Sequence, residues 1–178
     1  LSMPVGFKNA TDGNVQVAID GIRSSANPHH FLSVTKQGVA AIVATRGNED
    51  CHVILRGGAS GPNYSAEHIE EVVGKLEEKS LAGRIMIDCS HANSGKDHEV
   101  QAEVARQVAG QVARGSDRIS GLMLESFLRD GNQNADGVER AELVYGQSIT
   151  DACMGWERSR PLFDELVEAV RERRSKSG

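Results

Sequence analysis

The chain has 178 residues, 39% of them hydrophobic, which is enough to fold around one core. Its formal net charge is −5, and an acidic chain without a basic stripe is a poor partner for nucleic acid. No apolar run approaches the roughly 20 residues that a membrane-spanning helix needs. The three cysteines, Cys51, Cys89 and Cys153, form no CxxC pair, which argues against a secreted disulfide framework and predicts a cytoplasmic location.

The first part of the chain predicts strands and helices in alternation. Residues 3–9 predict a short strand, followed by a helix with Thr11 or Asp12 as its cap. Residues 29–35 predict the next core strand. No helix fits directly after that strand, and Gly47-Asn48 lies between two apolar runs, so we expect an inserted antiparallel hairpin at about 40–56.

The second part of the chain continues the alternation with longer helices. Ser65 is a suitable cap for a helix over 66–78, and residues 84–90 predict a core strand. A long polar loop at 127–150 is unusual in a compact domain and is typical of functional or disordered segments. The other predicted elements are a helix over 98–113 with Val100, Val104, Val108 and Val112 on its inner face, a strand over 119–126 and a final helix over Pro161–Arg173.

This alternation predicts an α/β fold with a parallel sheet. A doubly wound sheet usually carries a GxGxxG run, which this chain lacks, whereas a TIM barrel draws site residues from the carboxyl ends of several strands. Five apolar runs here end in polar groups: Lys8, Lys36, Arg56, the segment 88–93 and Glu125. Because a barrel closes with eight strands over about 250 residues, we expect residues 1–178 to be the C-terminal portion of one, with about five strands.

Three residues are candidates for a divalent-metal site. His91 follows one predicted core strand, Glu125 ends another, and Asp151 follows the long loop. Brought to one rim, an imidazole and two carboxylates make a nitrogen and oxygen ligand set for a divalent metal. The alternative is that they are unrelated surface or capping residues, which spacing alone does not exclude.

Two cations end strands on the same predicted rim. Arginine binds phosphate or carboxylate through two parallel hydrogen bonds, and lysine acts as a point charge, so Lys8 and Arg56 are candidate anion ligands. Gly57 and Gly58 would let the backbone approach a ligand closely. Ordinary turn glycines and ion-paired side chains are the alternative. Together with a metal site, the two cations indicate a phosphorylated, carboxylated substrate.

An ordered set of motifs covers nearly the whole chain: PVGFKNATDG, HFLSVTK, CHVILRGG, PNYS, MIDCSHANSGK, LES, GNQ and YGQSITDACMGWE. This set resembles 3-deoxy-D-arabino-heptulosonate 7-phosphate (DAHP) synthase, class I, the type found in enteric bacteria and yeasts. Each motif alone is weak, but the ordered set is specific.

The resemblance implies a TIM-barrel enzyme that condenses phosphoenolpyruvate with erythrose 4-phosphate and releases phosphate, the first step of aromatic amino-acid biosynthesis. It implies a divalent metal, manganese in the first place with iron, cobalt or zinc as alternatives, held by His91, Glu125 and Asp151. It places phosphoenolpyruvate on Lys8 and Arg56, so that Lys8, Arg56 and His91 are the expected catalytic residues.

The sequence departs from the family in lacking its first half. The family's fourth metal ligand, a cysteine, and its KPRT segment lie there, and by the resemblance Cys89 is not that cysteine. Leu1 is not an initiator methionine, so we expect a processed chain or one that begins within a longer protein. We therefore expect the chain alone to be inactive.

The family is commonly regulated by an aromatic amino acid, and the full-length protein is expected to form a homo-oligomer. By the resemblance, the effector site falls on Leu1, Ser2, Phe31, Ser33 and Val43, for which core and hairpin packing is the alternative. Two other functions remain open: a non-catalytic half-barrel that binds an amino acid or a partner, and another phosphoenolpyruvate-dependent sugar-acid synthase.

Overall fold

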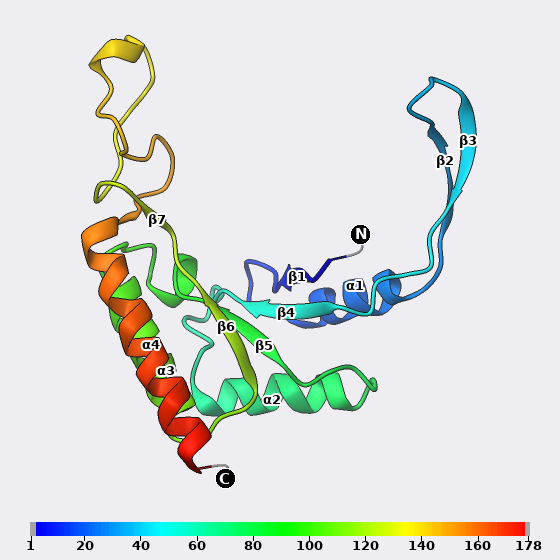
Figure 1. Ribbon diagram of the computed structural model, residues 1–178, viewed down its shortest axis with the longest axis horizontal. Helices are drawn as coiled ribbons and strands as arrows, with labels where there is room; N and C mark the ends of the chain where they lie inside the picture. The colour runs from blue at the N-terminus through cyan, green and yellow to red at the C-terminus, as the bar shows by residue number, and fades with distance from the viewer. Residues whose placement is uncertain (1–2, 177–178) are drawn as a thin grey trace.

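A computed structural model describes residues 3–176 and is built on a sheet of parallel strands (Figure 1). The four strands pair in the order β1-β4-β5-β6, each parallel to its neighbour. The predicted α/β class with a parallel sheet is therefore confirmed. The strands are β1 (Val5–Lys8), β4 (Cys51–Leu55), β5 (Ile85–Asp88) and β6 (Ile119–Met123).

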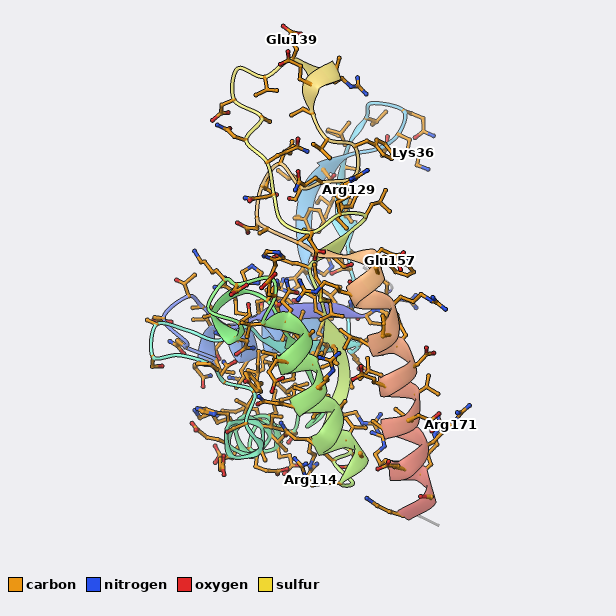
Figure 2. All side chains as sticks on the ribbon, turned by 90° about the vertical axis from the view of Figure 1, so that its left-hand side faces the viewer. Lys36, Arg114, Arg129, Glu139, Glu157 and Arg171 are labelled. Carbon is orange, nitrogen blue, oxygen red and sulfur yellow. The ribbon has the colours of Figure 1, made fainter. Side chains whose placement is uncertain are left out.

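Helices connect and cover these strands. α1 contacts β1 and β4, and α3 packs along α4, as Figures 1 and 2 both show. In Figure 2, Arg114 marks the C-terminal end of α3, and Arg171 lies in α4 before that helix ends. The helices are α1 (Gln16–Ala26), α2 (Ala66–Glu77), α3 (Gln101–Ala113) and α4 (Trp156–Lys176), with short 3-10 turns η1 (His91–Asn93) and η2 (Arg140–Glu142).

Alternation along the strands separates a core from a polar face. Val53 pairs with Ile85 and Leu55 with Ile87, and all four are buried in the cluster that contains the inner faces of the helices. Because successive side chains in a strand point to opposite faces, Asp88 lies on the other face of β5. The strands thus bury their apolar residues against the helices and leave the opposite face for the site.

The hairpin predicted over 40–56 is wrong in its bounds. The antiparallel pair is β2 (His30–Val34) with β3 (Ala40–Ala44), and it projects away from the main sheet (Figure 1). Residues 29–35 are therefore not a core strand, whereas Cys51–Leu55 is one. The physical reason is burial on both faces, since β4 places Val53, Ile54 and Leu55 in the interior while Leu32 of β2 is 84% exposed.

Two predicted helix starts also need correction. α1 begins at Gln16 because the Asp12 carboxylate accepts from the Asn14 N–H and forms a turn before the helix. α4 begins at Trp156, directly after a short strand, and Pro161 lies inside it. Pro161 is the sixth residue of α4, beyond the four N-terminal N–H groups that lack intrahelical partners, so the helix continues past it with one backbone hydrogen bond missing.

The predicted helices over 66–78 and 98–113 are confirmed in type and inner face. Ser65 caps α2 by accepting a hydrogen bond from the His68 N–H. Val104, Val108 and Val112 of α3 are buried as predicted, while Val100 lies just before the helix and is 38% exposed. Amphipathic periodicity therefore identified both helices.

The segment predicted as a loop over 127–150 begins and ends at a short parallel strand pair, β7 (Ser126–Phe127) with β8 (Met154–Gly155). Gln133 organises the loop by donating to the Val144 carbonyl at 2.9 Å and accepting from the Val144 N–H at 2.8 Å. The loop projects from the sheet, as the hairpin does at the other end (Figure 1). No helix within residues 3–176 is long and apolar enough to cross a membrane.

Replacement of Leu55 should test the assignment of β4 to the core. Leu55→Ala removes a fully buried side chain and should lower the free energy of unfolding by about 2–5 kcal/mol. Leu32→Ala in the exposed hairpin should change it by less than about 0.5 kcal/mol. Urea unfolding followed by circular dichroism measures both, and equal effects would contradict the corrected hairpin.

Candidate active site

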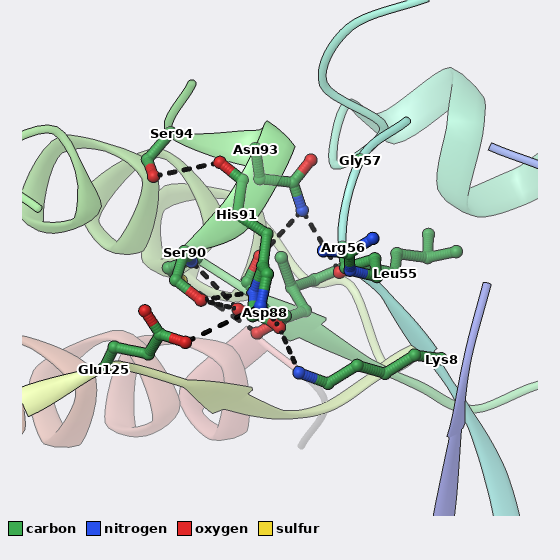
Figure 3. A network of polar contacts seen from close by, with 12 residues as sticks. Lys8, Leu55, Arg56, Gly57, Asp88, Ser90, His91, Asn93, Ser94 and Glu125 are labelled. Carbon is green, nitrogen blue, oxygen red and sulfur yellow. Dashed lines mark hydrogen bonds and ion pairs between the residues drawn. The ribbon is translucent and has the colours of Figure 1, made fainter. Parts of the chain in front are cut away.

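Polar side chains gather at the carboxyl ends of the parallel strands (Figure 3). Lys8 ends β1, Arg56 follows β4, and Asp88 ends β5. Because these strands are parallel and adjacent, their carboxyl ends share one edge of the sheet. His91 and Glu125 follow β5 and β6 to the same edge, so the predicted site residues of the strands lie together.

The three predicted metal ligands converge. One ligand atom from each of His91, Glu125 and Asp151 lies within 4.8 Å of the other two, and His91 Nε2 is 3.6 Å from Glu125 Oε1. The three line a cavity of about 50 Å³. His91 and Glu125 are half-buried and Asp151 is exposed. One imidazole nitrogen and two carboxylates fit a small divalent cation, so the donor set is a candidate metal site.

A tight turn presents His91 to this cavity. His91 begins η1 with a backbone φ of +53°, in the left-handed region that few residues other than glycine adopt. Gly57 packs against this turn with no room for a side chain, because a Cβ there would lie 2.7 Å from the Asn93 nitrogen. A non-glycine residue held in this region often marks a functional site.

Cys89 lies in the core and not in the polar edge that contains His91. Its side chain is fully buried in the core, on the helix side of the sheet. Burial, and then the Asp88 carboxylate, raises the pKa of the Cys89 thiol to about 12. A protonated, buried thiol is a poor metal ligand, so the prediction that Cys89 is not the ligand agrees with its environment.

Gln101 positions the backbone of Glu125. The Gln101 side chain is buried and accepts from the Glu125 N–H at 2.8 Å, while its Nε2 donates to the Glu125 carbonyl at 3.3 Å. The oxygen and the nitrogen of the Gln101 amide are therefore both hydrogen-bonded to the backbone of Glu125. Sequence reasoning missed Gln101 because it treated α3 only as an apolar stripe.

Asp88 is the buried hub of the polar edge. Its Oδ2 accepts from Lys8 Nζ at 2.7 Å and lies 3.0 Å from His91 Nδ1, and its Oδ1 accepts from the Ser90 N–H at 2.9 Å (Figure 3). Burial acts to raise the pKa of Asp88, but hydrogen bonds from Lys8 and Ser90 outweigh it and hold that pKa below its usual value. Sequence reasoning gave Asp88 no role, although its alternation with Ile87 places it on the face of Lys8.

Asparagine side chains join the ends of three strands. Asn93 Nδ2 donates to the Leu55 carbonyl at 3.1 Å and to the Asp88 carbonyl at 2.8 Å. Asn9 accepts from the Arg56 N–H at 2.9 Å. Both asparagines are buried, so each would carry an unsatisfied polar group without these contacts. They hold the carboxyl ends of β1, β4 and β5 in fixed relation.

The two predicted anion ligands lie on adjacent strands at the same edge of the sheet. In the β1–β4 register Lys8 pairs with Ile54, so Arg56 lies just beyond it on the adjacent strand. Lys8 is 36% exposed and its ammonium is bonded to Asp88. The Arg56 guanidinium has no ion-pair partner within residues 3–176. An arginine at this edge is thus available to a phosphate or carboxylate.

The predicted effector residues lie apart from this edge. Phe31, Ser33 and Val43 belong to the hairpin, where Phe31 pairs directly with Val43. Phe31 also lines a cavity of about 560 Å³ at the base of the hairpin. Leu1 and Ser2 lie outside the described residues. Lys36 occupies the hairpin turn, so it does not join the cations of the site.

The fold and the site define an α/β protein whose parallel strands present a candidate divalent-metal site beside Lys8 and Arg56, the two predicted anion ligands. Residues 1–163 match the DAHP synthetase I family. The chain is 55% identical over 177 residues to the tyrosine-inhibited phospho-2-dehydro-3-deoxyheptonate aldolase of Schizosaccharomyces pombe, covering 98% of this chain and 47% of that protein. It is 53% identical over 174 residues to the Phe-sensitive enzyme of Escherichia coli, covering 98% and 49%.

A solved structure of the phospho-2-dehydro-3-deoxyheptonate aldolase from Francisella tularensis SCHU S4 superposes with a TM-score of 0.90 at 49% identity, covering 97% of this chain and 50% of that one. The chain belongs to the DAHP synthetase I family, as the motifs predicted. It spans about half the length of the relatives that it matches.

Acid should weaken the contribution of Asp88 to stability. The pKa of Asp88 is lowered in the folded state, so its stabilisation is present above the unfolded value of about 3.9 and is lost as the pH falls through the folded value. The loss of unfolding free energy caused by Asp88→Asn should therefore be largest near neutral pH and shrink below about pH 4. Urea unfolding at several pH values measures it.

The matched control is Asp117→Asn, because Asp117 is 81% exposed and precedes β6, at the end of that strand opposite the site. Its effect should be small and nearly independent of pH. A pH-independent effect of Asp88→Asn would contradict the ionised, hydrogen-bonded state of Asp88.

Proposed function

We propose that this chain is the C-terminal part of a TIM-barrel DAHP synthase. The observation that carries the proposal is the convergence of His91, Glu125 and Asp151 beside Lys8 and Arg56 at the carboxyl edge of a parallel sheet. In a TIM barrel the site lies at that edge and draws residues from several strands. Family membership supports the reaction.

The described sheet supports a barrel that needs a second part to close. Within residues 3–176, β1 pairs with β4 alone and leaves its other edge open. A barrel closes with eight strands, so strands of a preceding half would pair with that edge. By the family resemblance, that half also carries the cysteine ligand and the KPRT segment. The part of the site described here would then be one side of the complete site.

The proposed reaction joins C3 of phosphoenolpyruvate to the aldehyde carbon of erythrose 4-phosphate. Water adds at C2, and cleavage of the C–O bond releases phosphate. Arg56 would bind the phosphate or carboxylate of phosphoenolpyruvate through two hydrogen bonds, with Lys8 as a second positive charge. Their contribution is to hold C3 in reach of the aldehyde, which is catalysis by positioning.

His91, Glu125 and Asp151 would hold the divalent cation at this edge. The chemistry that a bound divalent ion supplies is polarisation of the aldehyde oxygen. We propose manganese as the ion, because two carboxylates and one imidazole are ligands that it accepts. The neighbouring Lys8 and Arg56 would bring the phosphorylated substrate beside that ion.

We propose that the hairpin takes part in regulation by an aromatic amino acid. The relatives from S. pombe and E. coli are named as tyrosine-inhibited and Phe-sensitive. Phe31, Ser33 and Val43 are the described positions that match the family's effector site. The apolar hairpin around them is exposed, which also supports the proposed homo-oligomer of the full-length protein.

Removal of His91 should weaken metal binding. The three described ligands should bind Mn²⁺ weakly, and His91→Ala should lower the affinity at least tenfold, or about 1.4 kcal/mol. Titration calorimetry with Mn²⁺ measures this in the 178-residue chain. His30→Ala, which removes an exposed histidine from the hairpin, is the control and should bind as the unchanged chain does. Equal binding by His91→Ala would remove His91 from the proposed site.

Complementation tests the proposed reaction. The chain alone should release no phosphate from the two substrates with Mn²⁺, and addition of the first half of the E. coli relative should restore release. Lys8→Ala should then lower kcat/KM about 100-fold, because the phosphoenolpyruvate is no longer positioned. Lys36→Ala, which removes a cation from the hairpin turn, should leave the rate unchanged. Activity of the chain alone would refute the half-site.

A further inference from the structure

We propose that Asp88, together with Ser90, is a positioning residue that holds His91 in one tautomer, with its proton on Nδ1 and a free electron pair on Nε2. The same carboxylate anchors Lys8, so one buried group aligns the metal ligand with the anion ligand. The inference rests on the proposed function because it assigns Nε2 to the metal. The hydrogen bonds around Asp88 carry it.

The Ser90 hydroxyl donates its single proton to Asp88, so it cannot donate to His91. Ser90 Oγ lies 2.5 Å from Asp88 Oδ1 and 2.7 Å from His91 Nδ1. An ionised carboxylate accepts hydrogen bonds and donates none, so the single hydroxyl proton points to Asp88. Ser90 can then only accept from His91, which requires a proton on Nδ1.

A second contact leads to the same tautomer independently. His91 Nδ1 lies 3.0 Å from Asp88 Oδ2, and that oxygen is again only an acceptor. Nδ1–H therefore faces two acceptors, Ser90 Oγ and Asp88 Oδ2, and no donor. A neutral imidazole has one proton, so Nε2 is left with its electron pair.

The unprotonated Nε2 of His91 faces the candidate metal site. His91 Nε2 is the ring atom 3.6 Å from Glu125 Oε1, and Asp151 completes this group of three. A metal-ligating histidine must offer an unprotonated nitrogen, and a carboxylate on its other nitrogen sets the ring orientation. Asp88 meets this requirement from within the protein core.

Lys8 shares the same carboxylate oxygen. Lys8 Nζ donates to Asp88 Oδ2 at 2.7 Å, and the Asp88 side chain is fully buried, so it has little room to move. Because the Lys8 ammonium and the His91 imidazole both contact Asp88 Oδ2, this one oxygen atom sets the distance between them. A shift of Asp88 would displace both ligands together.

Asparagine at position 88 cannot replace these contacts. The Asp88 carboxylate accepts from Lys8 and from both the N–H and the hydroxyl of Ser90, and it lies 3.0 Å from His91 Nδ1. The amide of asparagine has an NH₂ donor at one of its two ends. That NH₂ would therefore face at least one of these donors, and the two could not form a hydrogen bond. If its NH₂ faces Ser90, the Ser90 hydroxyl proton is released toward His91 Nδ1 and favours the Nε2–H tautomer.

The experiment combines nitrogen NMR of the His91 ring with Mn²⁺ titration calorimetry. In the metal-free 178-residue chain, the ¹⁵N shifts of His91 should show the Nδ1–H tautomer. Asp88→Asn should populate Nε2–H and lower Mn²⁺ affinity by about 10–100-fold. Asp117→Asn, the exposed control, should change neither measurement.

The outcomes separate this inference from the proposed function. An Nε2–H tautomer in the unchanged chain would overturn the inference, and this result does not depend on whether Asp88→Asn folds. An Asp88→Asn chain that keeps both the tautomer and the Mn²⁺ affinity would overturn it as well. If the unchanged chain shows Nδ1–H but binds no Mn²⁺, the metal centre of the proposed function fails while the tautomer assignment stands.

Discussion

The polar edge of this protein depends on a carboxylate that is buried and fully hydrogen-bonded. Asp88 accepts from Lys8 and Ser90 and lies against the His91 ring, so it links the end of β1 to the turn after β5. An ionised group in the interior is stable only when such partners replace water. The same contacts hold its pKa low, which keeps the group charged and able only to accept.

The backbone around Asp88 is held just as firmly. Asn93 ties the ends of β4 and β5 together, and Gly57 lets the loop after β4 pack directly on the His91 turn. On the opposite face, Val53 and Ile85 are buried against the helices. A close-packed core beneath and bonded asparagines above leave the site residues on rigid strand ends, which is where positioning by a protein is most accurate.

The described chain also has surfaces that suit a larger assembly. β1 has one open edge, and an unpaired strand edge is a template for further strands. The hairpin exposes apolar side chains, among them Leu32 at 84% and Ile42 at 72%. In the proposed function, these are the surfaces where strands of a preceding barrel half or another copy would pack.

The sequence by itself determined the class of fold, the type of each long helix and the edge at which the site lies. Periodicity identified α2 and α3 because an amphipathic stripe is a local property of the chain. Strand exits marked by Lys8, Arg56, His91 and Glu125 indicated a shared edge because parallel strands end on the same side.

Only the tertiary structure decided which apolar runs pair and what the polar residues contact. Residues 30–34 and 51–55 are similarly apolar in sequence, and burial between neighbours alone distinguishes the core strand β4 from the projecting hairpin. The role of Asp88 was equally hidden, because its partner Lys8 lies 80 residues away. Hydrogen bonds and burial between distant segments exist only once the chain has folded, so local patterns do not contain them.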